Sequence, residues 1–471
     1  MVEKTDVIIV GGGVGGCAIG AMLSHRGKKV KLFDKNQIIG GRCLTYEHQG
    51  FKIDLGVHLF GVGDKGYLGD VLRRIERPNA LTWVVSNNPR PTLFYKDKSM
   101  IYSRKNMAQV IGSSEEDFNL AMAFFSEVLS MRKKNINDLK YVGLSDFIKS
   151  YAKDPKVANK LQTFVSMIAG QYFVTELHET STAEFITSFR QVVNSKSSAY
   201  PIGGCVAIPE AYQKKIIDSK GEVELNAKVK KIIIENDKAI GIELDDGRNL
   251  FSDIIISNAD IKNTVFNLIG EKYFENEYVK RVKGLKYAKH CLALKVGLDK
   301  QISDQKLVMY VGADYSEMES TVNEVEKGKV PDNPGGMITS PSNYDPNLAP
   351  KGCQSIFFGT ACLGEQPKSY YDKWAEKCWE GFLKVFPEAE KHLIFKKMDS
   401  PLLVDSYAGE TGNVIGIAQT VDQIYEKRPS QVSPIEGLFI VGAEAGGHGI
   451  GAELAANSAM ELDDYFISKN L

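Results

Sequence analysis

The stretch Asp6-Val-Ile-Ile-Val-Gly-Gly-Gly-Val-Gly-Gly16 decides the fold of this chain. Its apolar start is typical of a buried parallel strand, and its glycines satisfy the pattern G-x-G-x-x-G. A helical pattern follows as far as Gly27, and a second apolar run, residues 29–33, leads to Asp34. Strand, glycine loop, helix, strand and acid in this order within about 30 residues predict a dinucleotide-binding Rossmann unit. A glycine-rich turn without a ligand is the alternative, and the complete order of elements argues against it.

Each part of this unit has a predicted task in holding a pyrophosphate. Gly11 permits the tight turn, Gly13 lets the backbone approach the phosphates, and Gly16 lets helix and strand pack closely. The amino end of the helix supplies free N–H donors and partial positive charge. The Asp34 carboxylate is placed to accept hydrogen bonds from ribose hydroxyls, and it disfavours the 2′-phosphate of NADP. The predicted nucleotide-binding residues of this unit are Gly11, Gly13, Val14, Gly15, Gly16, Asp34 and Lys35.

A second candidate phosphate contact follows in Ile39-Gly-Gly-Arg42. A guanidinium makes paired hydrogen bonds with phosphate oxygens, and the adjacent glycines favour this role over that of a solvated loop cation. Gly41 and Arg42 therefore join the predicted cofactor site. His58 is as consistent with a structural cap on a loop as with a position beside a reacting ring.

Composition bounds the class of protein. The chain has 471 residues, which at about 150 residues per domain predicts about three domains or lobes. Lysine and arginine number 58 and aspartate and glutamate 59, so the net charge is −1 and nucleic acid is not a predicted partner.

Cysteine usage and the apolar runs indicate where the protein resides. The seven cysteines form no C-x-x-C pair, which argues against a zinc ribbon and a disulfide framework and favours a reducing compartment. The chain shows no signal-peptide pattern at its start and no apolar run of about 18 residues. We predict a cytoplasmic protein without a metal site, with peripheral contact to the cytoplasmic face of a membrane as an open alternative.

Two segments far from the first unit narrow the prediction. Near the end of the chain, Gly437–Gly442 is a buried strand, residues 443–451 form a glycine-rich loop, and a helical pattern follows from about residue 452 to 466. In the middle, Tyr200-Pro-Ile-Gly-Gly204 precedes a meander of short strands that ends at Ser257-Asn-Ala-Asp260.

Together with the two glycine motifs near the amino end, these segments resemble the FAD-dependent phytoene desaturase and amine oxidase superfamily. The carotenoid desaturase, carotenoid isomerase and retinol saturase branch is the most similar part of it. The resemblance implies an α/β fold: a Rossmann-type, glutathione-reductase-like FAD-binding domain built from discontinuous segments, with an inserted α+β substrate domain and a helical lid lobe. The implied divisions are residues 1–92, 195–260 and 429–471 for the FAD-binding domain, 93–194 for the helical lobe and 261–428 for the substrate domain.

The resemblance also implies further cofactor contacts. The backbone of Val229 would meet the adenine, Glu444 would lie near the ribityl chain and pyrophosphate, and the helix after Gly451 would point at the pyrimidine edge of the flavin. That helix end carries about half a positive charge, which stabilises the reduced ring. No cysteine follows Cys378, so the expected FAD is noncovalent. The cofactor residues implied by resemblance are Val229, Gly442, Glu444, Gly449, Ile450 and Gly451.

The function implied is hydride transfer between flavin N5 and an unsaturated isoprenoid or other long-chain lipid, in desaturation, saturation or isomerisation. The expected partner is therefore a hydrophobic small molecule, and the oligomeric state is not predicted. One alternative is an amine oxidase or a dehydrogenase of a small polar donor. Another is a non-enzymatic prenyl-lipid escort protein, against which the intact glycine motif argues.

The candidate acid–base residues are His448, His58 and Tyr407. For His448 a hydrogen bond to FAD or to the loop backbone is an equally strong alternative. Glu444 is better explained by cofactor binding, and Glu453 by its place in the first turn of a helix. In the helical lobe, the apolar band from residue 164 to 174 could touch a long hydrocarbon or a membrane surface. We favour the interpretation that most of its side chains form the core of the lobe and only a subset faces a ligand.

Overall fold

A five-stranded parallel sheet gathers strands from three distant parts of the chain. The computed structural model describes residues 5–56, 58–103, 105–106, 114–312, 321, 323–409 and 412–471. The sheet order is β19-β13-β1-β2-β9, and neighbouring strands are parallel. Its strands are β1 (Val7–Val10), β2 (Val30–Phe33), β9 (Glu222–Glu224), β13 (Ile254–Ser257) and β19 (Leu438–Ile440). This arrangement confirms the predicted Rossmann-type α/β domain built from discontinuous segments.

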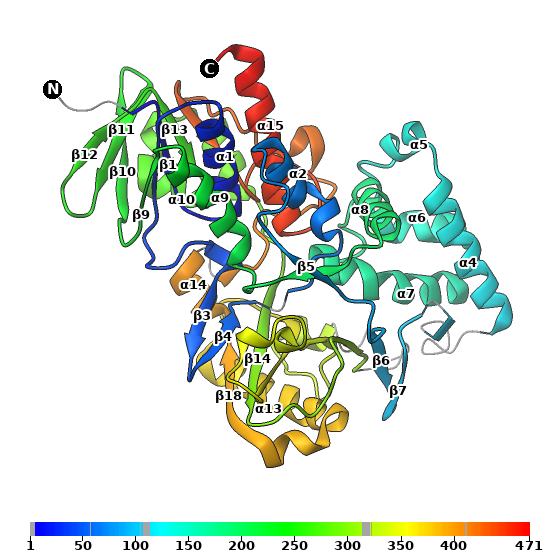
Figure 1. The fold of residues 1–471 in the computed structure, drawn as a ribbon. Helices are drawn as coiled ribbons and strands as arrows, with labels where there is room; N and C mark the ends of the chain where they lie inside the picture. Colours follow the sequence, from blue (N-terminus) through cyan, green and yellow to red (C-terminus); the bar gives the residue numbers. More distant parts are fainter. Residues whose placement is uncertain are drawn as a thin grey trace.

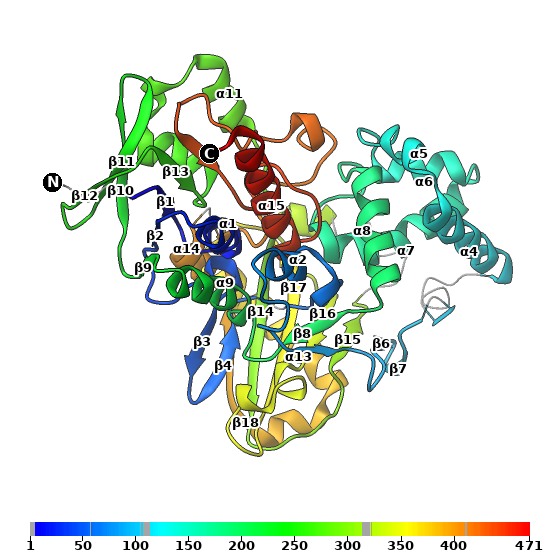
Figure 2. The ribbon, with the colours of Figure 1, turned by 45° about the horizontal axis from the view of Figure 1, so that its top comes forward.

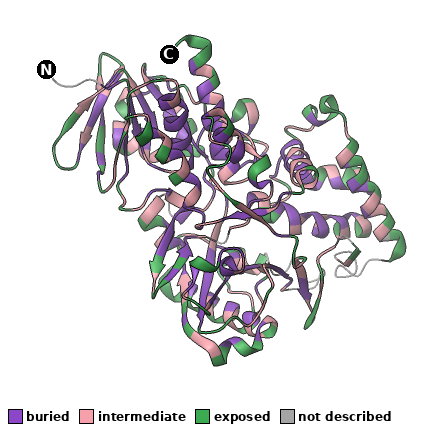
Figure 3. Cartoon of the chain, viewed as in Figure 1, coloured by how far each residue is buried: buried purple, intermediate pink, exposed green. Residues whose placement is uncertain are grey.

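Successive residues of β1 point to opposite faces of this sheet and so join two cores. Val7 and Ile9 pack with α1 (Val14–His25), α9 (Ala207–Asp218) and α15 (Ala452–Lys469). Ile8 and Val10 pack with the small antiparallel sheet of β10 (Val229–Glu235), β11 (Lys238–Leu244) and β12 (Asn249–Phe251). Figure 2 shows α15 beside α1 and α2 (Tyr67–Arg74), although 377 residues lie between the end of α2 and the start of α15 in the sequence. The central strand β1 and nearly all of α1 are buried, whereas the edge strand β9 is partly exposed (Figure 3).

A seven-stranded sheet lies below the parallel sheet (Figure 1) and is called the substrate sheet here, after the domain to which the resemblance assigns it. Its order is β18-β14-β17-β16-β15-β6-β7. Within the described ranges β6 and β15 pair in parallel, and the other neighbouring strands are antiparallel. One face packs on α13 (Lys368–Val385), and the other turns towards the helical lobe. The strands are β6 (Thr92–Tyr95), β7 (Lys98–Ile101), β14 (His290–Leu298), β15 (Leu307–Tyr310), β16 (Gly336–Thr339), β17 (Gln354–Cys362) and β18 (Leu393–Asp399).

The hairpin β6–β7 departs from the predicted division of the chain. Except for Thr92, it lies within the segment 93–194 that the resemblance assigns to the helical lobe, yet it belongs to the substrate sheet through the pairing of β6 with β15. Local sequence pattern does not report a pairing between strands more than 200 residues apart. The other short elements are β3 (Thr45–His48), β4 (Phe51–Asp54), β5 (Trp83–Val85), β8 (Ala199–Pro201), α10 (Ile261–Asn263), α11 (Asn276–Gly284) and α14 (Pro401–Ala408).

The helical lobe stands to one side of both sheets (Figure 1). It contains α4 (Glu115–Ser130), α5 (Lys133–Asn137), α6 (Leu144–Tyr151), α7 (Pro155–Phe173) and α8 (Thr182–Ser195). Asp154 caps α7 by accepting two backbone N–H groups, and Pro155 occupies the first turn, where its missing N–H is not needed. Phe164, Ile168 and Phe173 are buried in the core of the lobe, which confirms the favoured interpretation for most of the apolar band, whereas Val174 packs against a different cluster. No helix in the described ranges is long and apolar enough to cross a membrane.

Candidate cofactor and substrate site

One continuous cavity of about 1870 Å³ joins the parallel sheet to the other two lobes. Its wall includes the β1–α1 loop, the loop before α15, strands β14 to β16 and one side of α7. Small-ligand pockets usually measure about 300–1,000 Å³, so this cavity has room for a cofactor together with a second molecule. The amino- and carboxy-terminal segments therefore meet in one cleft, as the sequence predicts.

Most of the predicted cofactor residues lie on this cavity. Those in its wall are Gly11, Gly13, Val14, Gly15, Asp34, Lys35, Gly41, Arg42, Val229, Glu444, Ile450 and Gly451, together with the acid–base candidates His58 and Tyr407. Gly16, Gly442, Gly449 and His448 do not belong to the described lining. Gly16 packs helix against strand instead, since a Cβ there would lie 2.2 Å from the carbonyl oxygen of Gly11.

Asn258 fills the space that the glycines of the first motif leave. A Cβ on Gly13 would lie 2.6 Å from Asn258 Nδ2, and a Cβ on Gly15 would lie 2.7 Å from Asn258 Oδ1. Sequence reasoning missed this residue. It follows β13, whose carboxyl end lies beside that of β1, and ligands of parallel sheets bind at this edge.

Asp34 is held rigidly at the carboxyl end of β2. Its carboxylate accepts the backbone N–H of Gly12 at 2.7 Å and that of Asn36 at 2.8 Å. Burial raises the pKa of Asp34, although these two hydrogen bonds oppose the shift. A fixed acceptor that lines the cavity beside the glycine loop suits a ribose.

Glu444 is the clearest polar group in the cavity wall that lacks a protein partner of ordinary geometry. Its side chain is 2% exposed, and within the described chain neither carboxylate oxygen accepts a hydrogen bond. The nearest cation is Arg42, whose guanidinium nitrogen lies 3.6 Å from Oε1. Burial and the charge of Asp260 raise the pKa of Glu444 to about 7, against the effect of Arg42 and Arg428. A buried carboxyl group of this kind is matched to a ligand that donates hydroxyl hydrogen bonds.

The amino end of α15 opens directly onto the cavity. Gly451 has φ +53, and its neighbours Ile450 and Ala452 line the wall with it. Glu453 accepts the backbone N–H of Leu68 at 3.1 Å, and burial raises the pKa of Glu453 to about 8. The side chain therefore ties α15 to α2 and is largely neutral at pH 7, which leaves the positive helix end available to a ligand.

His448 lies outside the cavity, at the contact with the helical lobe. Its Nδ1 is 3.1 Å from Glu184 Oε2, and its ring centroid is 4.9 Å from that of Tyr425. Burial lowers the pKa of His448, but the hydrogen bond and charge of Glu184 outweigh this effect and the pKa is raised overall. The geometry favours a structural role for His448 over proton transfer to a molecule in the cavity.

His58 lines the cavity and has a buried carboxylate behind it. Its Nδ1 lies 3.4 Å from Cys205 Sγ and 3.9 Å from Asp54 Oδ2. Burial lowers the pKa of His58, whereas Cys205 and Asp54 raise it, and the net shift is upward. Asp54 is itself held by the hydroxyl of Thr45 at 2.7 Å and by the hydroxyl of Tyr200.

Cys43, His58 and Cys205 come together from three separate segments, which the sequence did not indicate. Their ligand atoms lie within 4.8 Å of one another, a spacing compatible with a soft metal ion. Burial raises the pKa of the Cys205 thiol well above its usual value, which opposes the thiolate form that metal binding requires. The absence of a metal therefore stays our prediction.

Tyr407 lies on α14 near the nucleotide end of the cavity. Its carbonyl oxygen accepts the side-chain amide of Asn36 at 3.0 Å, two residues beyond Asp34. This contact associates Tyr407 with the carboxyl end of β2 more closely than with the substrate sheet.

The two cavity walls formed by the seven-stranded sheet and by α7 differ in polarity. Met309 and Val311 on one side belong to the buried core between the substrate sheet and the helical lobe, and Met337 packs against that core. On the other side α7 turns a mostly polar face to the cavity, to which Met167 and Tyr172 also belong, while Phe164 and Phe173 are buried in the core of the lobe. The cavity-facing polar residues of α7 are Asn159, Gln162, Thr163, Ser166 and Gln171.

Comparisons with known proteins agree with this geometry. Residues 9–75 match the family model described as an NAD(P)-binding Rossmann-like domain. A chloroplastic prolycopene isomerase of Daucus carota is 24% identical over an alignment 497 positions long, gaps included. The alignment covers 93% of this chain and 76% of that protein. A zeta-carotene-forming phytoene desaturase of Myxococcus xanthus is 24% identical, with 93% of this chain and 89% of that protein covered. The chain is similar to carotenoid desaturases and isomerases.

This similarity confirms the predicted resemblance, and solved structures confirm the fold. An oxidoreductase from Methanosarcina mazei superposes with a TM-score of 0.73 at 20% identity, covering 98% of this chain and all of that one. The chain thus carries a dinucleotide-binding domain of the predicted type, joined to a substrate domain and a helical lobe.

Proposed function

We propose that this protein is an FAD-dependent oxidoreductase that transfers a hydride between noncovalently bound flavin and an unsaturated isoprenoid or other long-chain lipid. The observation that carries the proposal is the single cavity in which the dinucleotide-binding edge of the parallel sheet opens onto the substrate sheet and the helical lobe. The named activities of the relatives from Daucus carota and Myxococcus xanthus support the substrate class.

Three features of the chain fit FAD. Gly11, Gly13 and Gly15 line the cavity without side chains, so a phosphate can approach their backbone closely. The buried carboxyl group of Glu444 lacks a protein hydrogen-bond partner in the described chain and suits the hydroxyls of a ribityl chain. No cysteine occurs after Cys378, which supports noncovalent binding. When bound, the flavin would supply the two-electron chemistry that the protein side chains lack.

The residues of the chain would then bind, orient and keep the site dry. Asp34 would accept hydrogen bonds from the ribose hydroxyls and Arg42 would contact a phosphate, while the amino end of α15 would stabilise negative charge on the ring. Met309 and Val311 supply apolar surface against which a hydrocarbon excludes water.

We assign proton transfer to His58, which alone among the predicted acid–base histidines lines the cavity within the described chain. Cys205 and Asp54 lie behind the ring and raise the pKa of His58, so they stabilise the protonated imidazole that such a transfer forms. Desaturation, saturation and isomerisation place the substrate in the same way, and the proposal covers all three. Because such lipids are insoluble in water, we further propose a cytoplasmic protein that meets its substrate at a membrane face.

The test begins with the colour of the purified protein. We expect a yellow protein from which acid or heat releases free FAD, and anaerobic incubation with polyene lipids should change the positions or geometry of their double bonds. Product analysis is needed beside flavin bleaching, because isomerisation gives no net reduction. A colourless protein that cannot be reconstituted with FAD would overturn the proposal and favour a lipid-binding role.

A further inference from the structure

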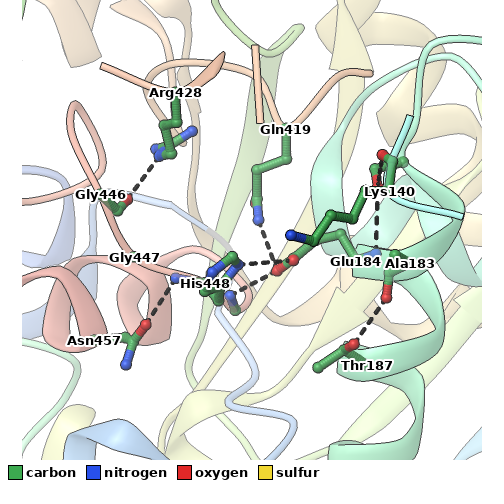
Figure 4. A network of polar contacts seen from close by, with 12 residues as sticks. Lys140, Ala183, Glu184, Thr187, Gln419, Arg428, Gly446, Gly447, His448 and Asn457 are labelled. Carbon is green, nitrogen blue, oxygen red and sulfur yellow. Dashed lines mark hydrogen bonds and ion pairs between the residues drawn. The ribbon is translucent and has the colours of Figure 1, made fainter. Parts of the chain in front are cut away.

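The loop between β19 and α15 is held by side chains and not by regular secondary structure. Several of its glycines adopt the left-handed region, where the backbone has few stabilising neighbours of its own. Asn457 accepts the N–H of His448 at 2.8 Å, and Glu461 accepts the N–H of Gly447 at 2.7 Å. From the other side, Arg428 donates to the carbonyl of Gly446 at 2.7 Å (Figure 4). Each backbone group contacted in this way restricts the path of the chain into α15.

Glu184 adds a contact of different origin, because it comes from the helical lobe. Its Oε1 accepts the backbone N–H of Gly449 at 2.9 Å and the side-chain amide of Gln419 at 3.1 Å. Its Oε2 lies 3.1 Å from His448 Nδ1. Figure 4 shows the carboxylate reaching from α8 to this loop, whereas Asn457 and Arg428 belong to the carboxy-terminal part of the chain itself.

The position of Glu184 on α8 explains how its charge is tolerated there. The side chain is 1% exposed, so an unpartnered carboxylate would be strongly unfavourable. Glu184 stands in the first turn of α8, where the helix dipole stabilises negative charge, and Ser181 caps the same turn. The two oxygens also contact the side-chain amide of Gln419, the ring of His448 and the backbone N–H of Gly449. These contacts compensate for the burial of the charge.

We infer that Glu184 is a positioning residue that lets the helical lobe set the backbone of Gly449 and, through it, the amino end of α15. Ile450, Gly451 and Ala452 follow Gly449 directly and line the cavity. The lobe that carries Glu184 also carries α7, which forms the wall at the substrate end. A displacement of this lobe therefore reaches the cofactor end of the cavity through one carboxylate. The inference concerns the contact between two parts of the chain, and its exchange test does not depend on which dinucleotide binds.

Hydrogen exchange of the full-length protein as purified tests the inference, with Glu184→Ala, Glu184→Gln and Thr187→Ala compared with the wild type. Thr187 is the matched control, since it lies on the same helix and its hydroxyl bonds to the carbonyl of Ala183 within that helix. We expect Glu184→Ala to raise amide exchange in residues 447–452 at least tenfold and to leave exchange in α1 and α13 unchanged. Glu184→Gln keeps an acceptor for Gly449 but loses the charge that faces His448, so it should raise exchange in residues 447–452 by a smaller factor, about threefold.

A second measurement separates positioning from a general loss of stability. If the protein carries FAD as proposed, Glu184→Ala should also shift the visible flavin bands and weaken FAD binding about tenfold, whereas Thr187→Ala should change neither. Wild-type exchange in residues 447–452 of a folded Glu184→Ala protein would overturn the inference. Should that variant not fold, Glu184→Gln decides: exchange identical to that of Thr187→Ala, with unshifted flavin bands, would overturn it as well. A wild type that binds no FAD would contradict the proposed function and leave the exchange comparison valid.

Discussion

Replacing Gly13 by alanine tests the role of the glycine loop in cofactor binding while leaving the fold intact. Gly13 has φ −72, so alanine meets no backbone strain, and the added Cβ lies 2.6 Å from Asn258 Nδ2. That atom is the free end of a side chain and can move, so we expect overpacking to lower the free energy of unfolding by about 1–3 kcal/mol. A domain with about 5–15 kcal/mol of stability tolerates this loss.

The loss of cofactor affinity should be larger than the loss of stability. Gly13 lines the cavity where we propose that the pyrophosphate lies, so the added methyl group and the displaced Asn258 side chain would obstruct its approach to the backbone. Hydrogen bonds to charged groups contribute about 1.5–3 kcal/mol each. Loss of two such bonds weakens binding by about 3–6 kcal/mol, which raises Kd about 10²- to 10⁴-fold. Fluorescence titration of FAD into the stripped protein, beside thermal unfolding, measures both quantities.

Gly20→Ala is the matched control for this experiment. Gly20 lies on the same helix, and its Cβ would approach Ile216 Cδ1 at 2.8 Å, in the core and outside the cavity lining. We expect Gly20→Ala to change stability by a similar amount and to retain FAD. An unchanged Kd in Gly13→Ala would refute the assigned phosphate approach. Recovery of binding when Asn258→Ala is added would likewise show that the clash with Asn258, and not the blocked approach, weakens the site.

Three further predictions follow from burial and charge. Glu453→Gln should raise the unfolding temperature at pH 8 and have little effect at pH 5. The pKa of Glu453 is about 8 in the folded protein and 4.5 in its ordinary state, so the free energy of unfolding falls as the pH rises between these values, by about 4 kcal/mol at pH 8. Equal effects of the substitution at both pH values would contradict this. His58→Gln should lower kcat about 10²- to 10⁴-fold while FAD content stays at the wild-type level, and undiminished turnover of a lipid substrate would exclude His58 from proton transfer. Phe164→Ala, on the core face of α7, should lower the free energy of unfolding by about 3–5 kcal/mol in denaturant titrations. Gln162→Ala, on the cavity face, should change it by less than about 1 kcal/mol, and equal losses would contradict the assignment of the two faces.

The dinucleotide cradle could be predicted because its parts are neighbours in sequence. An apolar strand, glycines at fixed spacing and an acid after the next strand are local signals, and the structure places Gly11, Gly13 and Asp34 on one cavity. The alternation of β1 between two cores likewise follows from an apolar run that is buried on both faces. The two terminal segments could be joined in the prediction through their resemblance to one superfamily.

Contacts between segments that are distant in sequence could not be predicted from such local patterns. Nothing near Glu184 in the sequence indicates that its carboxylate reaches Gly449, which lies 265 positions away. Asn258 stands in a short polar segment whose importance appears only when β13 pairs with β1. His448 looked suited to proton transfer because it lies in a glycine loop, yet the loop turns it towards α8.

The sequence by itself determined the kind of fold and the place of its phosphate cradle, because strand and helix periodicity and glycine spacing depend on a few adjacent dihedral angles. Only the tertiary structure decided which side chains complete the cavity and which support it from behind. Those positions depend on how whole sheets and lobes pack, and packing brings together residues between which the chain itself carries no periodic signal.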